Sequence, residues 1–475
     1  MKINSSWYTA SRLSLSVGLI GGSIGLFLGI AAGFQPLLLC LAILALTLFA
    51  CFFTYFEQTV IGLLILRSSL DIFSDWQVPA AFAIGLDALT ILYVILMLLL
   101  GRQIITDKFF WFFATWVAIQ GLWVIFIPLG GLGLNASYLL VGIREWVRLF
   151  SWLMVYLLVM QLKDKVKPER FVGLLMLSLI APMAISLIQV IVPSGILPDL
   201  LVYRPDKDFE VLGEGSRIFG TLGHPNGLAK FLILFIALTW WQLERSLERW
   251  FWIILMSILI FFLVTTQALF AIAMFGVFIV VRAVQNISVS RLFGAAIVFA
   301  LFIALFATSE YGLERLNSIA NTPLLNPDIG ISQAILMAEG NSFNWRIAHW
   351  TYLLQAWQSH QLFGYGLGGT PAIPYFYNDA HSDYVRALVE GGVVGLTTFF
   401  IFQAGQLVRL VQLYKKASPT SDLRRFCSIL LAIFWSFLVG MTTDNMWGNT
   451  VMYFYWWSLL AVAGWDWNQD RPSQS

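Results

Sequence analysis

Long apolar stretches separated by short polar segments make up most of this 475-residue chain. A stretch of roughly 20 apolar residues can cross a bilayer as a helix, and continuous stretches favour helices over the alternating pattern of membrane strands. We expect twelve to fourteen spans, among which the third candidate is the weakest because Arg67 and Asp71 interrupt it. The candidates are 13–33, 36–56, 58–73, 85–101, 109–129, 139–160, 171–192, 225–243, 250–266, 267–284, 291–308, 383–411, 427–443 and 447–465.

The composition leads to the same fold class. Hydrophobic residues make up 59% of the chain and charged residues 11%, against about a quarter charged in an ordinary soluble domain. This excludes a cytosolic enzyme and a disordered scaffold, and the net charge of +2 gives no reason to expect a nucleic-acid partner. The sequence predicts an all-α, polytopic transmembrane bundle in a lipid bilayer, with a large helical extracytoplasmic loop. The first run, Leu13 to Gly33, is interpreted as a retained span rather than a cleaved signal peptide.

The positive charges predict the orientation of the spans. With the N-terminus in the cytoplasm and the spans alternating, 18 of the 28 Lys and Arg residues fall on the cytoplasmic side, and eight of the other ten are arginines. Both termini are then cytoplasmic. The expected parts are N-terminal spans at 1–192, a core at 193–411 that contains the extracytoplasmic loop 309–382, and C-terminal spans with a cytoplasmic tail at 412–475.

Within loop 309–382, residues 344–360 predict an amphipathic helix. Trp350, Leu353, Leu354 and Trp357 form its apolar stripe. Glycines and prolines from Gly364 onward break this helix and predict a flexible turn. The many tryptophans that flank spans predict an interfacial belt; they include Trp111, Trp240, Trp241, Trp250, Trp456, Trp457 and Trp465.

A first polar cluster precedes the apolar run that begins at Pro225. Proline fits the first turn of a helix, and the free N–H groups there favour an anion. Arg217, His224 and Lys230 lie near this helix start, although an ordinary helix start with a snorkelling lysine would use the same residues. Arg144 and Arg148 lie one turn apart near the same expected side, and an arginine embedded in a membrane is a functional candidate.

Two further clusters follow in the large loop and at its end. Arg346 and His349 share a helix face, next to tryptophans at 345 and 350 that could rest on lipid headgroups. His381 precedes a span, with Asp383 and Tyr384 close enough in sequence to orient it, and Arg386 and Glu390 are spaced to pair. A histidine can act as a base near neutral pH. A lipid-anchoring arginine and a polar helix cap are the structural alternatives.

No metal or cofactor motif is present in the sequence. The three cysteines, Cys40, Cys51 and Cys427, lie in apolar runs and behave as small hydrophobes, and no histidine has metal-ligand spacing to Cys, Asp or Glu. There is no nucleotide-binding glycine motif, and the turn at 364–369 has only a superficial likeness to a phosphate cradle. We therefore expect no metal and no cofactor.

Together, these motifs resemble the O-antigen ligase and polymerase superfamily. The resemblance rests on Arg217-Ile-Phe-Gly-Thr-Leu-Gly-His224-Pro-Asn226, Arg315, Arg346 with Trp350, the turn Gly364-Tyr-Gly-Leu-Gly, and His381-Ser-Asp-Tyr followed by Glu390-Gly-Gly. It is best marked over residues 217–410. The chain departs from many members in having Thr266-Gln267 in place of Ser-Arg, and Ser382 where asparagine is common.

The resemblance implies a metal-independent, membrane-embedded glycosyltransferase of the C type at the periplasmic face of the bacterial inner membrane. Such a protein takes a glycan from an undecaprenyl-diphosphate carrier and transfers it to an acceptor hydroxyl on lipid A–core, a growing polysaccharide or a protein. By this resemblance Arg217 and Arg346 bind the diphosphate and His381 is the base. Residues expected to bind the diphosphate or orient these groups are Arg315, His224, Asp383, Tyr384, Arg386, Arg144 and Arg148. Asp383 would orient His381 or raise its pKa.

Alternatives remain open at this point. A ligase and a repeat-unit polymerase share the donor and differ in the acceptor, and the ligase type is favoured as the broader description. Proteins of similar sequence have been proposed as bicarbonate transporters, but a small-anion transporter should carry inverted repeats and ionisable groups at mid-membrane. A purely structural membrane protein would leave the outer arginines and the loop histidine unexplained.

Overall fold

A computed structural model describes residues 36–126, 137–203, 217–285, 342–373 and 377–467, with isolated positions between 297 and 313. The expected span 13–33 and the candidate Arg315 lie outside the described residues. The chain divides into two compact units, residues 1–60 and 61–475. In the first unit the structure describes helix α2 (Pro36–Thr54) and the beginning of α3. All residues considered below belong to the second unit.

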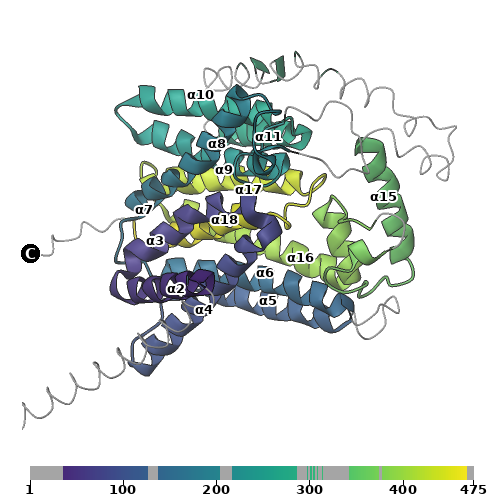
Figure 1. The fold of residues 1–475 in the computed structure, drawn as a ribbon, viewed down its shortest axis with the longest axis horizontal. Coiled ribbons are helices and arrows are strands. Elements are labelled where there is room, and N and C mark those ends of the chain that lie inside the picture. The colour runs from purple at the N-terminus through teal and green to yellow at the C-terminus, as the bar shows by residue number, and fades with distance from the viewer. Residues whose placement is uncertain are drawn as a thin grey trace, which may run out of the picture. The chain divides into compact units, whose positions relative to one another are not determined.

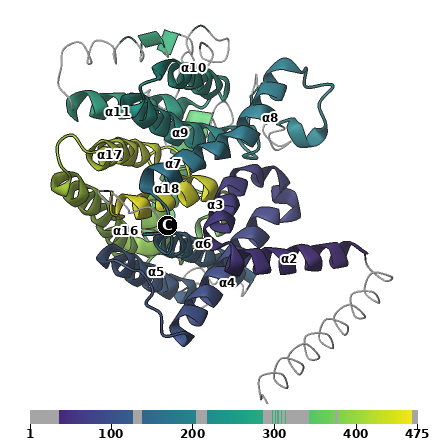
Figure 2. The same ribbon diagram turned by 90° about the vertical axis from the view of Figure 1, so that its left-hand side faces the viewer.

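Every regular element in the described residues is helical, as the sequence predicts (Figure 1). Short 3₁₀ turns connect several helices, and Figure 2 shows the bundle turned by 90°. The remaining helices are α3 (Phe56–Leu66), α4 (Val78–Leu99), α5 (Lys108–Phe126), α6 (Ser137–Met160), α7 (Pro168–Leu175), α8 (Ile180–Ile191), α9 (Pro225–Arg245), α10 (Arg249–Thr265), α11 (Leu269–Gln285), α15 (Ser342–Trp357), α16 (Asp383–Lys416), α17 (Asp422–Gly440) and α18 (Thr450–Ala463).

The apolar runs predict these helices closely. Within the described residues, six helical segments are long and apolar enough to cross a membrane, and four further apolar helices are shorter. The weak third candidate is an 11-residue helix followed by 3₁₀ turns, in which Arg67 and Asp71 form an ion pair. The architecture is that of a polytopic helical membrane protein. The total of twelve to fourteen spans stays a prediction.

Helices α9 and α18 form the centre of the second unit. Every residue of α18 from Val451 to Ala463 is buried, as expected for a helix that is apolar on all sides. The predicted tryptophan belt is therefore wrong in part, since Trp241, Trp456, Trp457 and Trp465 are at most 5% exposed. Trp457 packs in an aromatic core with Trp152, Phe113 and Phe402. The other three pack against phenylalanines, Trp456 against Phe437, Trp241 against Phe426 and Trp465 against Phe171. Trp111 and Trp250 are each 63% exposed, as a belt position requires.

The outer surface of the bundle is apolar. Helix α10 exposes Phe251, Ile253, Ile254 and Phe261, and α4 exposes Ile84, Ile95 and Leu98. A protein in water buries side chains of this kind, whereas lipid tails solvate them at no cost. The exposed apolar faces therefore agree with a position in a bilayer.

The connections between helices gather at two ends of the bundle. At one end, Arg217 bonds to the loop after α10, Asn226 to the loop after α17, and the start of α16 to that same loop. At the other end, Asp107 before α5 pairs with Arg409 of α16. Which end faces the cytoplasm stays a prediction.

Helix α15 and the turn after it form a small subdomain at the first end. Helix α15 lies across the direction of the bundle helices, at the right in Figure 1. Leu353 is fully buried in a cluster with Tyr365, Ile373 and Val389, which confirms an amphipathic helix. Its stripe is narrower than predicted, because Leu354 is 37% exposed.

The turn after α15 is fixed by hydrogen bonds rather than open. Tyr365 N donates to Val389 O, and Gly366 N to Glu390 O. Gly364 has a φ of +67°, and a Cβ there would lie 2.5 Å from the carbon of Glu390 C=O. Only glycine permits this approach, so the turn attaches the subdomain to α16.

A candidate active site at one end of the bundle

The site is built from four chain segments that meet at the end of the bundle next to α15. They are the start of α9, the loop 266–268, the helix α15 with the loop to α16, and the loop between α17 and α18. None of these segments is close to the next in sequence. The site therefore exists only once the bundle has formed.

His224 is the N-cap of α9. Its Nδ1 accepts a hydrogen bond from the backbone N–H of Asn226 at 3.0 Å, and Pro225 occupies the first turn as predicted. Nδ1 therefore carries no proton. In the neutral imidazole Nε2 must carry it, and Nε2 lies 3.0 Å from the Tyr203 hydroxyl. His224 has no free lone pair for a substrate, so it orients the segment and is a poor candidate for the base.

Arg217 is held by backbone and amide oxygens. Its Nε donates to the carbonyl of Thr266 at 3.0 Å, and Nη2 donates to Asn226 Oδ1 at 3.2 Å. The guanidinium carbon lies 5.7 Å from the Tyr203 ring centroid, which is within cation–π range. These contacts orient the guanidinium through oxygen atoms that carry no net charge.

Asp444 is the acidic centre of the cluster. Its carboxylate pairs with Lys230 Nζ at 2.5 Å and lies 3.4 Å from Asn226 Nδ2, which joins it to Arg217 through one residue. Both members of the ion pair are 5% exposed or less. The structural alternative of a snorkelling Lys230 is therefore wrong, because a carboxylate from the α17–α18 loop pairs with the lysine inside the bundle.

His381 lies in the loop immediately before α16. Its Nδ1 is 2.9 Å from the carbonyl oxygen of Asp379, which can only accept, so Nδ1 carries the proton. Nε2 of the neutral ring is then the free basic nitrogen. The residue has a φ of +49°, an uncommon conformation for a residue other than glycine. Backbone strain of this kind occurs preferentially at functional sites.

Helix α15 supplies the aromatic and cationic wall around His381. The Trp345 ring packs against His349 and His381, with centroids 4.9 and 5.0 Å away. Trp350 Nε1 donates to the carbonyl of Ala380. These two tryptophans thus support the histidine loop, and their contact with lipid headgroups stays a prediction.

The electrostatic effects among these groups tie them into one cluster. Burial and then the charge of Arg217 lower the pKa of His224 to about 4, and His381 acts in the same direction. Burial and then Arg346 lower the pKa of His381, which Asp444 partly opposes. Burial raises the pKa of Asp444, but Lys230, His381 and Arg346 outweigh it and lower the pKa overall. The structure thus brings together Arg217, His224, Arg346 and His381.

Asp383 and Tyr384 have other partners than predicted. The Asp383 carboxylate accepts from the backbone N–H of Trp447 at 3.1 Å, and the Tyr384 hydroxyl donates to Leu438 O. The partner of His381 Nδ1 is the Asp379 carbonyl, and the pKa of His381 is lowered. The expectation that Asp383 orients His381 or raises its pKa is therefore wrong, because α16 directs that side chain toward α18.

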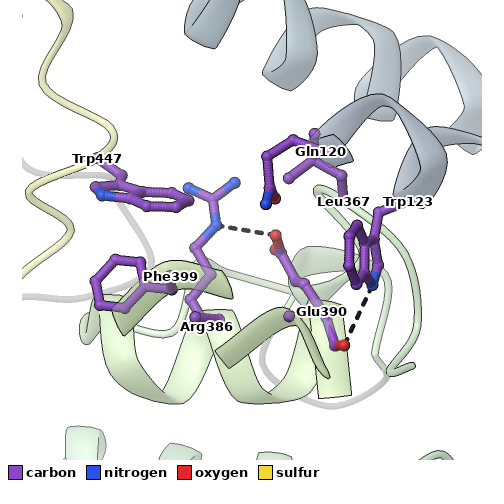
Figure 3. A pocket seen from close by; sticks show the side chains of 10 residues that line it. Gln120, Trp123, Leu367, Arg386, Glu390, Phe399 and Trp447 are labelled. Carbon is purple, nitrogen blue, oxygen red and sulfur yellow. Dashed lines mark hydrogen bonds and ion pairs between the residues drawn. The ribbon is translucent and has the colours of Figure 1, made fainter. Parts of the chain in front are cut away.

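The predicted pair of Arg386 and Glu390 forms, but inside a separate network (Figure 3). Arg386 bonds to Glu390 at 3.1 Å and to Glu145 of α6 at 2.7 Å, and Glu145 also pairs with Arg148. Glu390 accepts from the backbone N–H of Gly368, and its second oxygen from Thr370. Figure 3 shows Arg386 and Glu390 between the rings of Trp447, Phe399 and Trp123.

This network leaves little room for a ligand. The cavity beside Arg386 has a volume of about 20 Å³, enough for one water molecule. Arg386 and Arg148 are engaged with carboxylates, so the geometry favours a structural brace between α6, α16 and the 364–370 turn over a contact with a diphosphate. Arg144 is exposed on α6.

Sequence reasoning missed four members of the cluster, namely Asp444, Asn226, Tyr203 and Asp379. Asn226 lay within a quoted motif but received no role. Asp444 stands in a short polar segment, Thr442-Thr-Asp-Asn, between two apolar runs. A polar segment on the same expected side as His381 was the one signal that pointed to it.

The comparison with protein families supports the resemblance. Residues 251–400 match the family described as O-antigen ligase, whereas the comparison with curated proteins returned no significant match. The matched region contains α10, α15, His381 and the first half of α16. The matched region does not include Arg217, His224 and Asp444. The tertiary structure places these residues in the same cluster as His381. The 251–400 region is thus similar to the O-antigen ligase family, and this match supports the predicted resemblance of the chain to the O-antigen ligase and polymerase superfamily, whose members act in surface polysaccharide biosynthesis.

Proposed function

We propose that this protein transfers a glycan from an undecaprenyl-diphosphate carrier to an acceptor hydroxyl, as a glycosyltransferase of the ligase type. The observation that carries the proposal is His381, whose Nδ1–H is committed to a carbonyl while Arg346 and the Arg217–Asn226–Asp444 chain lie around it. The acceptor is a lipid-linked or growing glycan. The positive-charge bias of the other end favours a periplasmic site in the inner membrane, with both termini in the cytoplasm.

The base is His381 Nε2. It removes the proton from the acceptor hydroxyl as the oxygen attacks C1 of the donor sugar, and the bond from C1 to the diphosphate breaks. The proton remains on the imidazole until solvent removes it. Asp444 supports this step, because its carboxylate stabilises the imidazolium that forms. Trp345 packs edge to face with the ring and holds its orientation.

The arginines hold the leaving diphosphate. A guanidinium donates two parallel hydrogen bonds to phosphate oxygens and keeps its charge at any working pH. Arg217 is oriented by Thr266 O and Asn226 Oδ1, so its side chain loses little conformational entropy when it binds the diphosphate. Gln267, where many relatives have arginine, adjoins Thr266, and the charge for the diphosphate then comes from Arg217 and Arg346.

We expect transfer to be independent of divalent metal ions. Guanidinium groups supply the positive charge that a metal ion supplies in other transferases. Membranes that contain the protein, assayed with a carrier-linked glycan, should transfer it at the same rate with and without EDTA. An inhibition that Mg²⁺ reverses would contradict the proposed charge neutralisation.

The pH dependence should follow His381. A base is active when unprotonated, so the rate falls as the pH drops through its pKa. Burial and Arg346 lower the pKa of His381, so the midpoint of the acid limb should lie below 6.5, the usual value for histidine. Asp444→Asn removes a charge that raises this pKa and should move the midpoint lower still. A midpoint that stays in place in this variant would argue against His381 as the titrating group.

Deletion of the gene tests the function and separates the two types. In a ligase-type reaction, the loss should leave carrier-linked chains unattached to their acceptor, seen by gel analysis of surface glycan. Accumulation of single repeat units would instead indicate a polymerase. Unchanged surface polysaccharide with impaired uptake of a small anion would favour the transporter alternative.

A further inference from the structure

A second polar cavity lies at the opposite end of the bundle from His381. Helix α16 runs from Asp383 near the histidine to Lys416, and α9 from Pro225 to Arg245. The cavity is lined by the last turns of both helices, so it is separated from the site by the length of the bundle. It has a volume of about 470 Å³, which is within the range of ligand pockets.

The lining of this cavity is strongly basic. Arg249, Arg282, Arg424 and Arg425 contribute four guanidinium groups, against one carboxylate from Glu244. Positive charges that only determine topology are exposed, as Lys415 and Lys416 are on the same end, and the lining residue Arg249 is exposed as well. Arg282 instead is 5% exposed and pairs with Glu244 and the Ser428 hydroxyl. An arginine this deeply buried belongs to a built site rather than to a solvated face.

The remaining contacts orient the cluster toward the cavity. Arg424 lies over the Tyr414 ring, with its guanidinium carbon 4.4 Å from the centroid. Arg425 is half-buried and shares Asp422 with Arg245, at distances of 3.5 and 3.2 Å. Helices α10 and α17 begin here and α9, α11 and α16 end here, so their dipoles offset one another and the guanidinium groups supply the positive charge.

The cavity also has an apolar part. Trp240, Leu243 and Pro419 share its lining with the arginines. Next to it, the first turn of α10 exposes Trp250 and Phe251, side chains that suit lipid. A ligand with a charged head and an apolar body would satisfy both parts of the lining.

We propose that this cavity binds the phosphate group of an anionic ligand, supplied by a phospholipid headgroup or by a free phosphate compound. Basic pockets between membrane helices take anionic headgroups in this way, and each arginine near the surface adds to the affinity. Arginine forks match phosphate oxygens in pairs. The cavity is larger than one phosphate ion needs, which favours a headgroup. The site is independent of the glycan transfer proposed above.

The test uses the full-length protein purified in detergent. Its thermal unfolding midpoint is measured with added phosphatidylglycerol, with phosphatidylcholine, and with inorganic phosphate. The double variant Arg249→Gln, Arg424→Gln removes two lining charges, and Lys415→Gln, Lys416→Gln removes two exposed charges from the same end. Native mass spectrometry counts the phospholipids that stay bound.

Phosphatidylglycerol should raise the unfolding midpoint of the wild-type protein and of the lysine variant more than phosphatidylcholine does. In the arginine variant its affinity should fall roughly thirtyfold, which is the effect of two such charges. An equal rise with inorganic phosphate, lost in the same variant, would identify a free phosphate compound as the source. The proposal is overturned if neither phosphate source shifts the midpoint, or if the arginine and lysine variants respond alike.

Discussion

Replacing His381 with alanine should reduce glycan transfer by about a hundredfold or more, the usual contribution of a positioned base. The reason is geometric, since the ring donates from Nδ1 to Asp379 O and leaves Nε2 as the basic nitrogen. The measurement is transfer of a carrier-linked glycan by membranes with matched amounts of protein. Transfer at the wild-type rate would remove the base assignment.

A second variant separates loss of the base from loss of the fold. His381 has a φ of +49°, and asparagine tolerates this conformation better than alanine does. His381→Asn should therefore keep the loop and the unfolding temperature, yet be as inactive as the alanine variant. His360→Asn is the matched control, because that histidine bonds to Ser359 beyond α15 and should keep full activity.

Arg217→Lys should reduce transfer by about a hundredfold, close to the cost of removing one preorganised donor to a developing negative charge. Lysine keeps the charge but cannot donate to Thr266 O and present a fork at the same time. We expect Arg346→Lys to be impaired similarly, because a point charge on the α15 surface cannot form paired bonds to a diphosphate. Both are measured as transfer rates over a range of donor concentrations.

The control for these variants is Arg102→Lys, an exposed arginine that follows α4 at the other end of the bundle. It should leave transfer unchanged, which shows that arginine-to-lysine changes do not impair the protein in general. Wild-type turnover in both Arg217→Lys and Arg346→Lys would mean that the diphosphate is held elsewhere. Impairment of only one of them would leave the other arginine with a structural role.

The apolar pattern predicted the positions of the helices well, but it did not predict which side chains are buried or which residues they contact. The start of α9 at Pro225 follows from local chemistry, since proline and an N-cap side chain act on neighbouring backbone groups. The burial of Trp456 and Trp457 does not follow from local chemistry, because an apolar helix can have the same sequence whether lipid or other helices surround it. The burial of Lys230 depends on its ion pair with Asp444, which lies more than 200 residues later in the chain. No local sequence pattern predicts such a pair.

The amino-acid order alone determined the membrane class, the helix positions and the chemistry-bearing residues, because hydrophobicity and capping act over a few turns of chain. Only tertiary structure decided which of those residues meet. It places Arg217, His381 and Asp444 together at one end of the bundle. It also pairs Arg386 with Glu145 and Asp383 with the backbone of Trp447, away from this cluster. Packing also buried Arg282 in a basic cavity at the opposite end of the bundle. From the sequence alone, the positive charges at that end indicate only the orientation of the spans.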